Sequence, residues 1–538
     1  MHKIKKHYLI NPAALIIGML VCGLLSVSFG KELQWDLAGY HFYNPFAFLN
    51  HRMNTMDYWP PSAIQVYITP TLDFISYYLI QHCTPKMTEF ILGCLHGINA
   101  ALVFYISRFF LAFFIRDFRW QTGMAITSAV IGLYAPTVLP GIGAFFNDNT
   151  VSIFILGFIL WWACIFKKYF ASRSLSKIRL TCASILLGIA AGSKLTEGIY
   201  VAGFLAGFIL LPMPLRDKLT FFICSISGIA AGFILANGYW MWLLWDNFQN
   251  PFFPLFNGIF HSPYFPYLNW SEPRYLPRGI IESLLFPFYF SAGRKPTAEL
   301  YFTDFRFALV YVLFTLYFLA ILDKRKRSEL KNYTLWWLYL FFIFSYIAWQ
   351  TCFSIMRYLG VLQMLAPLVC MLLVLQLVKG FTDRLFSLLA IIVFIPNTMH
   401  PIRMERIQEF GSDYFNVKLP AFVARQQSAT VLLAYSFFAK TPNPKPNHYL
   451  IPFFPSGWHF TGIPFYRYQY EIPPRVRSFV QQGPQPVYLL SASNYMPSMY
   501  AAAKELHLMP AGPCGKITSD RQRLTHETIL LCPVQAAS

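Results

Sequence analysis

The sequence contains little charge. Only 12% of its 538 residues are Asp, Glu, Lys or Arg, whereas 56% are hydrophobic. A soluble domain carries about 25% charged residues, so the polar surface here is too small to cover a water-soluble globule of this length. Several runs of about 18 or more nearly uncharged residues are long enough to span a bilayer as helices. The composition therefore excludes an ordinary soluble protein and predicts a polytopic α-helical membrane protein.

Other familiar signals are missing as well. The ten cysteines form no CxxC or Cys/His pattern with metal-ligand spacing, no glycine-rich phosphate loop occurs, and no internal repeat is visible. Segment 8–30 is long enough to span the membrane and lacks the small-residue cleavage site of a signal peptide. We therefore expect this segment to be a retained transmembrane helix.

The net charge of +19 is distributed in a way that argues against nucleic acid as a partner. A trial topology places the basic clusters on one side of the membrane, where acidic residues are few. This asymmetry is the positive-inside signal that orients membrane helices. The clusters on the expected cytoplasmic side lie at 3–6, 108–119, 167–179, 216–218, 324–331 and 379–384.

Eleven spans with a cytoplasmic N-terminus place every basic cluster inside and form a transmembrane domain over residues 1–398. Segment 66–84 is apolar but carries Pro70 and Asp73, and counting it as a span would invert the charge pattern. We expect it to lie in the interface or to re-enter the outer leaflet. The predicted spans are 8–30, 87–107, 121–141, 149–166, 179–192, 196–213, 219–245, 306–323, 333–350, 357–378 and 385–398.

The tail, residues 399–538, has a different character. Strand-like runs at 430–438, 486–493 and 528–533 accompany helix-like segments near 474–482 and 497–507. We predict a small α/β domain on the outer, periplasmic face. Its two cysteines, Cys514 and Cys532, could form a disulfide in an oxidising compartment or remain free.

Four charged residues fall on the outer face under this topology: Asp36, Asp148, Lys194 and Arg357. Charges at membrane depth are costly and usually functional. Each also has a structural explanation. Asp36 could be an ordinary loop acid, Asp148 could cap its helix, Lys194 could snorkel to the headgroups, and Arg357 could pair with an acid to hold helices together.

Two carboxylates and two cations at an outer membrane surface are suited to group transfer from a lipid phosphate. A carboxylate can deprotonate an acceptor hydroxyl. Lysine and arginine can bind a phosphate and stabilise the negative charge that develops on it. A sugar linked to a lipid phosphate would supply both the phosphate and an apolar tail, whereas no phosphate loop is present for a nucleotide sugar.

The order of these motifs resembles the bacterial polytopic glycosyltransferases of the GT-C superfamily, in the broad group around glycosyltransferase family eighty-seven. The resemblance covers most of residues 8–398 and does not include the tail. It is carried by Asp36 with Tyr40-His41-Phe42-Tyr43-Asn44, Asn50-His51-Arg52, Gln65 to Pro70, Asp73, Asn147-Asp148, Gly192 to Thr196, Asn250 to Pro254, Asp304-Phe305-Arg306 and Arg357-Tyr358-Leu359.

The resemblance implies an enzyme of the bacterial inner (cytoplasmic) membrane and cell envelope that uses a polyprenyl-phosphate sugar donor, with a glycan, lipid or protein as acceptor. It implies juxtamembrane helices in the first outer loop, Asp36 as the base of an inverting transfer, and Asp148 as a second catalytic residue. Lys194 and Arg357 would bind the donor phosphate. The expected substrate pocket contains Tyr40, His41, Asn44, Arg52, Asp304 and Arg306.

The sequence leaves the cofactor open. Some members of the superfamily use a divalent metal and others do not, and Asp36, Asp148 and His41 could hold one. Two other functions also stay open: a transporter or flippase of lipid-linked saccharides, and a non-catalytic envelope assembly protein that binds through its tail. Transporters usually show repeated halves, which the sequence lacks.

Overall fold

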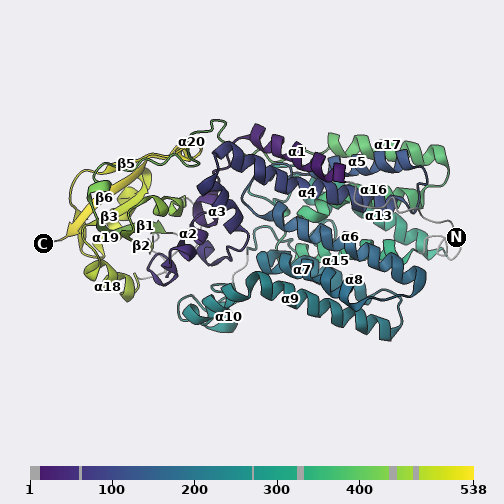
Figure 1. Cartoon of the computed structure of the whole chain (residues 1–538), viewed down its shortest axis with the longest axis horizontal. Helices are drawn as coiled ribbons and strands as arrows, with labels where there is room; N and C mark the ends of the chain where they lie inside the picture. The colour runs from purple at the N-terminus through teal and green to yellow at the C-terminus, as the bar shows by residue number, and fades with distance from the viewer. Residues whose placement is uncertain are drawn as a thin grey trace. The chain divides into compact units, whose positions relative to one another are not determined.

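The structure is a computed structural model that describes residues 12–59, 64–269, 272–323, 332–435, 445–464 and 472–537 (Figure 1). Residue contacts divide the chain into two compact units. The first, the helix unit, comprises Met1–Ser26, Phe90–Tyr239 and Ser271–Met404. The second, the loop–tail unit, comprises Val27–Glu89, Trp240–Trp270 and Glu405–Ser538, and so joins the first long loop to the predicted tail. The division at residue 398 stays a prediction.

Each predicted span overlaps a helix, but the helix in the span predicted at 121–141 ends at Leu133, eight residues before the predicted end. Among the described residues, six helices are long and apolar enough to cross a membrane: Pro12–Phe29, Pro85–Leu111, Asp148–Ser172, Leu215–Phe248, Tyr333–Cys352 and Met356–Leu377. The protein is thus a multi-helix membrane protein, and the total of eleven spans stays a prediction. The helices are α1 (Pro12–Phe29), α4 (Pro85–Leu111), α5 (Phe118–Leu133), α6 (Asp148–Ser172), α7 (Lys177–Ser193), α8 (Gly198–Ile209), α9 (Leu215–Phe248), α13 (Arg306–Leu322), α15 (Tyr333–Cys352), α16 (Gly360–Leu377) and α17 (Phe381–Asn397).

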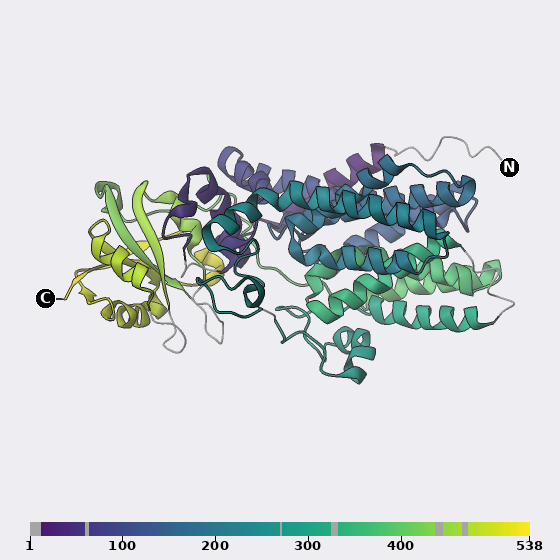
Figure 2. The ribbon, with the colours of Figure 1, turned by 90° about the horizontal axis from the view of Figure 1, so that it is seen from below.

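Polar residues at the helix ends and small residues inside explain why these segments pack as they do. Asp117 accepts a hydrogen bond from the Trp120 amide and caps α5. Helix α16 is almost entirely buried, as expected for the centre of a bundle. Helices α8 and α15 can approach closely because Gly203 has no side chain. A Cβ atom at this position would lie only 2.0 Å from Ser345 Oγ. Figure 2 shows these helices from a second side.

The first long loop, which was predicted to lie on the outer face, is largely helical in its described part, as the resemblance implies. It contains a π-helix, η1 (Leu37–His41), then α2 (Tyr43–Leu49), η2 (Arg52–Asn54), η3 (Ile64–Tyr67) and α3 (Asp73–His82). A helix of ten residues is about 15 Å long, half of the roughly 30 Å hydrocarbon core. The helix within segment 66–84 is therefore too short to span the membrane.

In its described part, the loop after α9 has only short helices, which agrees with its many prolines. These are α10 (Asn257–Phe260), α11 (Ile280–Leu284) and α12 (Phe286–Ser291). The predicted basic cluster at 324–331 lies outside the described residues, as do the first four residues of the span predicted at 8–30.

The tail forms a mixed sheet, and its described strands have the order β2-β1-β3-β6-β4, with β5 paired to β6. Strands β2 and β3 lie parallel to β1, whereas β6 is antiparallel to β3. The strands are β1 (Ser428–Tyr435), β2 (Gly457–Pro464), β3 (Val487–Ala492), β4 (Leu508–Pro510), β5 (Gly515–Ile517) and β6 (Ile529–Ala536). The sequence predicted β1, β3 and β6 and missed the others; positions 436–438 of the first predicted strand lie outside the described residues.

Two helices cover this sheet, α18 (Pro474–Gln482) and α19 (Met496–Lys504), and both match predicted helical segments (Figure 1). Val476 and Met499 from these helices share one hydrophobic core with Leu432 and Leu489 of the strands. Cys514 and Cys532 form a disulfide bond that links the start of the β5 hairpin to β6.

Candidate functional site

Three of the four predicted outer charges stand at helix ends of the helix unit. Asp148 begins α6, directly after Asn147, whose φ of 63° lies in the left-handed region that asparagine tolerates. Lys194 follows the last turn of α7, where the backbone becomes extended before η4 (Leu195–Glu197). Arg357 belongs to η5 (Met356–Leu359), the turn that leads into α16.

The structure brings these three residues together. The Lys194 ammonium lies 2.5 Å from Asp148 Oδ1, and both side chains are largely buried, with 18% and 14% exposed. Lys194 Nζ also donates a hydrogen bond to the Phe146 carbonyl at 3.1 Å. The Tyr358 ring lies beside both cations, 5.2 Å from Lys194 Nζ and 5.4 Å from the Arg357 guanidinium.

A residue that the sequence analysis did not single out completes this cluster. Glu197 is 4% exposed and close enough to Lys194 and Asp148 to interact with them electrostatically. Its signal in the sequence was a lone acid within the apolar stretch after Lys194. Two acids surround Lys194, so Arg357 is the cation better placed to meet an added negative charge.

Asp36 lies in the loop–tail unit and precedes the π-helix η1. Its side chain is buried, with 9% exposed. The π-helix is a rare element that occurs frequently at functional sites, and it ends at His41, so Asp36 and His41 lie one π turn apart. Burial raises the pKa of Glu32 to about 7, and the nearby Asp36 and Glu89 carboxylates add to the rise.

His41 pairs with Asp73, the first residue of α3. Its Nδ1 lies 2.7 Å from Asp73 Oδ1, and both side chains are buried, with 5% and 1% exposed. The Tyr40 ring packs against the imidazole with a centroid separation of 4.1 Å. Asp73 belongs to the motifs of the family resemblance and argues against a membrane span at 66–84, but its pairing with His41 was not predicted from the sequence.

Asn44 and Arg52, also expected in the pocket, are bound within the protein. Asn44 donates to the Ile68 carbonyl at 3.0 Å and accepts from Tyr58 Oη at 3.2 Å. Arg52 Nε donates to Asp57 Oδ2 at 2.9 Å, and Nη2 donates to the Trp458 carbonyl at 3.0 Å. Arg52 thereby connects the first loop to β2 of the tail.

Asp304 and Arg306 form a fully buried bidentate pair at the start of α13. The guanidinium donates to the two carboxylate oxygens at 2.8 and 2.6 Å and to the Gln363 carbonyl at 2.7 Å. This fork-to-fork geometry is typical of a strong ion pair. The pair fixes the first turn of α13 to α16. Its guanidinium and carboxylate atoms are engaged with each other and with the Gln363 carbonyl rather than directed to a substrate.

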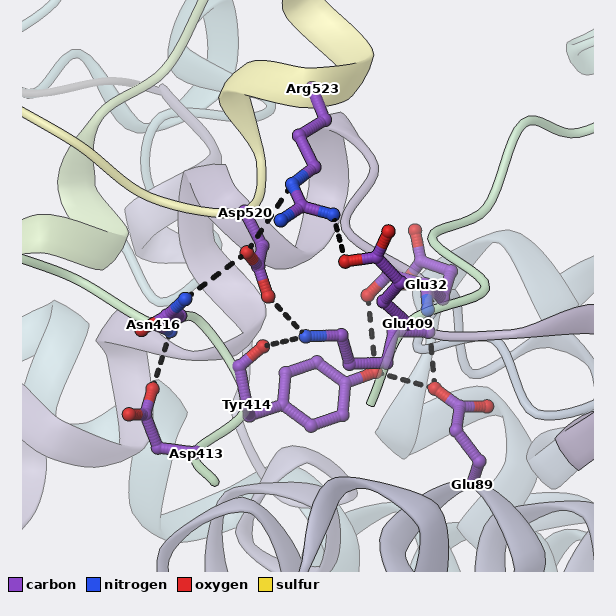
Figure 3. Close-up of polar contacts among 9 residues, drawn as sticks. Glu32, Glu89, Glu409, Asp413, Tyr414, Asn416, Asp520 and Arg523 are labelled. Carbon is purple, nitrogen blue, oxygen red and sulfur yellow. Dashed lines mark hydrogen bonds and ion pairs between the residues drawn. The ribbon is translucent and has the colours of Figure 1, made fainter. Parts of the chain in front are cut away.

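A second polar cluster, absent from the sequence predictions, joins distant parts of the loop–tail unit (Figure 3). Lys31 is fully buried, with its Nζ 2.5 Å from Asp520 Oδ2 and 3.1 Å from the Tyr414 carbonyl. Tyr414 Oη donates to Glu89 Oε1 at 2.5 Å and lies 3.2 Å from the Glu32 carbonyl oxygen. Four segments far apart in the sequence therefore meet in one network, which we call the Lys31 cluster.

Within the described ranges, no group of three or more His, Cys, Asp or Glu side chains is arranged to hold a metal ion. The carboxylates near His41 and Lys194 are each engaged by a nitrogen donor of the protein, at 2.7 and 2.5 Å. The residues described here therefore do not fit a metal centre.

The fold can be compared with known proteins. Neither protein-family models nor curated proteins match the sequence. A crystal structure of ArnT from Cupriavidus metallidurans bound to undecaprenyl phosphate is similar, with a TM-score of 0.51, 11% sequence identity and coverage of 97% of each chain. The same protein in the apo state matches with a TM-score of 0.48 and 10% identity, again over 97% of each chain. The chain thus has the fold of ArnT, and the similarity extends over nearly the whole length of both chains.

Proposed function

We propose that this protein transfers a sugar from a polyprenyl-phosphate donor to a hydroxyl group of a glycan, lipid or protein acceptor at the outer face of the inner membrane. The observation that carries the proposal is the fold, which matches over 97% of both chains a protein crystallised with undecaprenyl phosphate. The cluster of Asp148, Lys194 and Arg357 supports it, because it offers cations at the ends of apolar helices.

In this proposal Arg357 and Lys194 bind the donor phosphate. Arginine suits this role because its planar fork pairs with phosphate oxygens. Asp148 acts as the positioning residue of Lys194, since it lies 2.5 Å from the ammonium and fixes its direction. Glu197 is a second acid near the same ammonium.

Asp36 is the proposed base. Its carboxylate would take the proton of the acceptor hydroxyl as the oxygen attacks the anomeric carbon of the donor sugar. The bond from that carbon to the phosphate oxygen breaks, and polyprenyl phosphate leaves with the bonding electrons. A single displacement inverts the anomeric centre, and Asp36 then releases its proton to water.

Binding of polyprenyl phosphate tests the phosphate site directly. Arg357→Gln should weaken binding by about 10- to 100-fold, the usual value of a hydrogen bond to a charged group. Arg179→Gln is a matched control, because Arg179 is an exposed arginine on α7 with no place in the proposed site. Equal binding by the wild type and Arg357→Gln would refute the assignment.

A further inference from the structure

His41 and Asp73 form a buried pair whose hydrogen bond favours one tautomer of the neutral imidazole. An ionised carboxylate can only accept, so the hydrogen between Asp73 Oδ1 and His41 Nδ1, 2.7 Å apart, belongs to the imidazole. Asp73 is the first residue of the ten-residue helix α3, where the helix dipole favours a negative charge. In the neutral imidazole, Nε2 is then a hydrogen-bond acceptor.

Within the part of the chain that the structure describes, this Nε2 atom is buried and has no hydrogen-bond partner. Buried polar atoms are nearly always satisfied, because an unmade hydrogen bond costs free energy. The adjacent Asn44 shows the contrast, since both its amide nitrogen and its oxygen have protein partners. His41 therefore presents an acceptor that the protein itself does not use.

A purely structural role does not require this arrangement. The contact from Nδ1 to Asp73 alone would fix η1 to α3. An apolar or shorter side chain would avoid burying a second nitrogen without a partner. The imidazole is useful when Nε2 meets a donor that comes from outside the chain.

We propose that Nε2 of His41 accepts a hydrogen bond from a saccharide hydroxyl, with Asp73 as the positioning residue that fixes the tautomer. The inference rests on the proposed function and adds a contact for the sugar. A neutral acceptor matches a hydroxyl donor and disfavours a phosphate, whose oxygens are acceptors as well. The Tyr40 ring, 4.1 Å from the imidazole, supplies the apolar wall that ligand sites combine with a few polar groups.

The test compares binding of polyprenyl phosphate with binding of a panel of polyprenyl-phosphate hexoses and amino sugars. His41→Asn keeps an amide near the Nδ1 position and removes Nε2. If the hydroxyl belongs to the donor sugar, this variant should bind the preferred sugar donor about 3- to 10-fold more weakly and polyprenyl phosphate normally. If the hydroxyl belongs to the acceptor, polyprenyl phosphate and the sugar donor should both bind normally, and the KM for the acceptor should rise by a similar factor.

Asp73→Asn provides a second variant that does not alter the imidazole. An amide can donate to Nδ1, which would move the proton to Nε2 and turn the acceptor into a donor. It should show the same loss as His41→Asn, and the double variant should lose no more than either single variant. Asp520→Asn is the matched control, because it weakens a buried ion pair of the same unit and should leave the sugar preference unchanged.

The outcomes separate this inference from the function on which it rests. A wild type that binds neither polyprenyl phosphate nor any sugar-bearing form contradicts the proposed function. A wild type that binds the donor, with His41→Asn unchanged in donor binding and acceptor KM, overturns the role of His41 alone. A His41→Asn variant that loses polyprenyl phosphate and the sugar donor equally also overturns it, because the effect would then be structural.

Discussion

The Lys31 cluster predicts that a single lysine near the membrane controls the stability of the loop–tail unit. Lys31 is fully buried, and its ammonium contacts Asp520 Oδ2 at 2.5 Å and the Tyr414 carbonyl at 3.1 Å. Lys31→Met keeps the length of the side chain and removes its charge. Asp520 is then left buried with only weak compensation, from Asn416 at 3.4 Å and Arg523 at 3.7 Å.

Removing one partner of a buried ion pair typically costs 3–5 kcal/mol of unfolding free energy. Because the remaining contacts of Asp520 offset part of the loss, we expect about 3 kcal/mol. For a unit of 150–250 residues, this corresponds to a decrease in Tm of roughly 6–12 °C. The change can be measured by thermal unfolding of the detergent-solubilised protein, with the onset of proteolysis of the tail as the readout.

Two controls make this prediction specific. Glu409→Gln removes the ion pair between Glu409, 77% exposed, and Arg523, 49% exposed. Because the pair is exposed, the change in unfolding free energy should be less than about 1 kcal/mol. Combining Lys31→Met with Asp520→Leu should restore much of the loss, since no buried charge remains unpaired. A Lys31→Met protein as stable as the wild type would refute the proposed importance of this cluster.

Three further predictions concern stability. Burial raises the pKa of Glu32 from 4.5 to about 7, so its protonated form stabilises the fold at low pH. This contribution of roughly 3 kcal/mol should be complete below about pH 4.5 and be lost as the pH rises through 7. The pH dependence of Tm that it causes should be absent in Glu32→Gln. Replacing Cys514 and Cys532 by serine should lower the unfolding free energy of the tail by about 2–4 kcal/mol in thermal melts, and no change in Tm would contradict the role of the disulfide. Gly203→Ala should destabilise the α8–α15 contact by about 1–3 kcal/mol, since its Cβ would lie 2.0 Å from Ser345 Oγ, whereas Gly123→Ala, with nothing within 4 Å, should be tolerated in the same assay.

The positions of the apolar helices could be predicted from the sequence because hydropathy and charge asymmetry act locally along the chain. The same local patterns predicted β1, β3, β6, α18 and α19 of the tail. Strand β2 was missed because Gly457, His459, Thr461 and Gly462 interrupt its apolar character, and it forms through parallel pairing with β1. Such pairing depends on partners that are distant in the sequence.

The site was predictable where a charge stood out against an apolar background. Asp148, Lys194 and Arg357 were selected in this way, and the structure places them together. The pairing of His41 with Asp73 was not predictable, because it joins residues 32 positions apart through the packing of η1 against α3. The Lys31 cluster was missed for the same reason, since its partners are up to 489 positions apart.

Sugar transfer by the purified protein tests the central claim most directly. The wild type in detergent or vesicles should move a labelled sugar from a polyprenyl-phosphate donor to an acceptor, release polyprenyl phosphate and invert the anomeric centre. Asp36→Asn should bind the donor normally but reduce turnover by two or more orders of magnitude, about the contribution of a general base. Near-normal turnover by Asp36→Asn would contradict the role of Asp36, and donor binding by the wild type without any transfer would contradict the assignment as a glycosyltransferase.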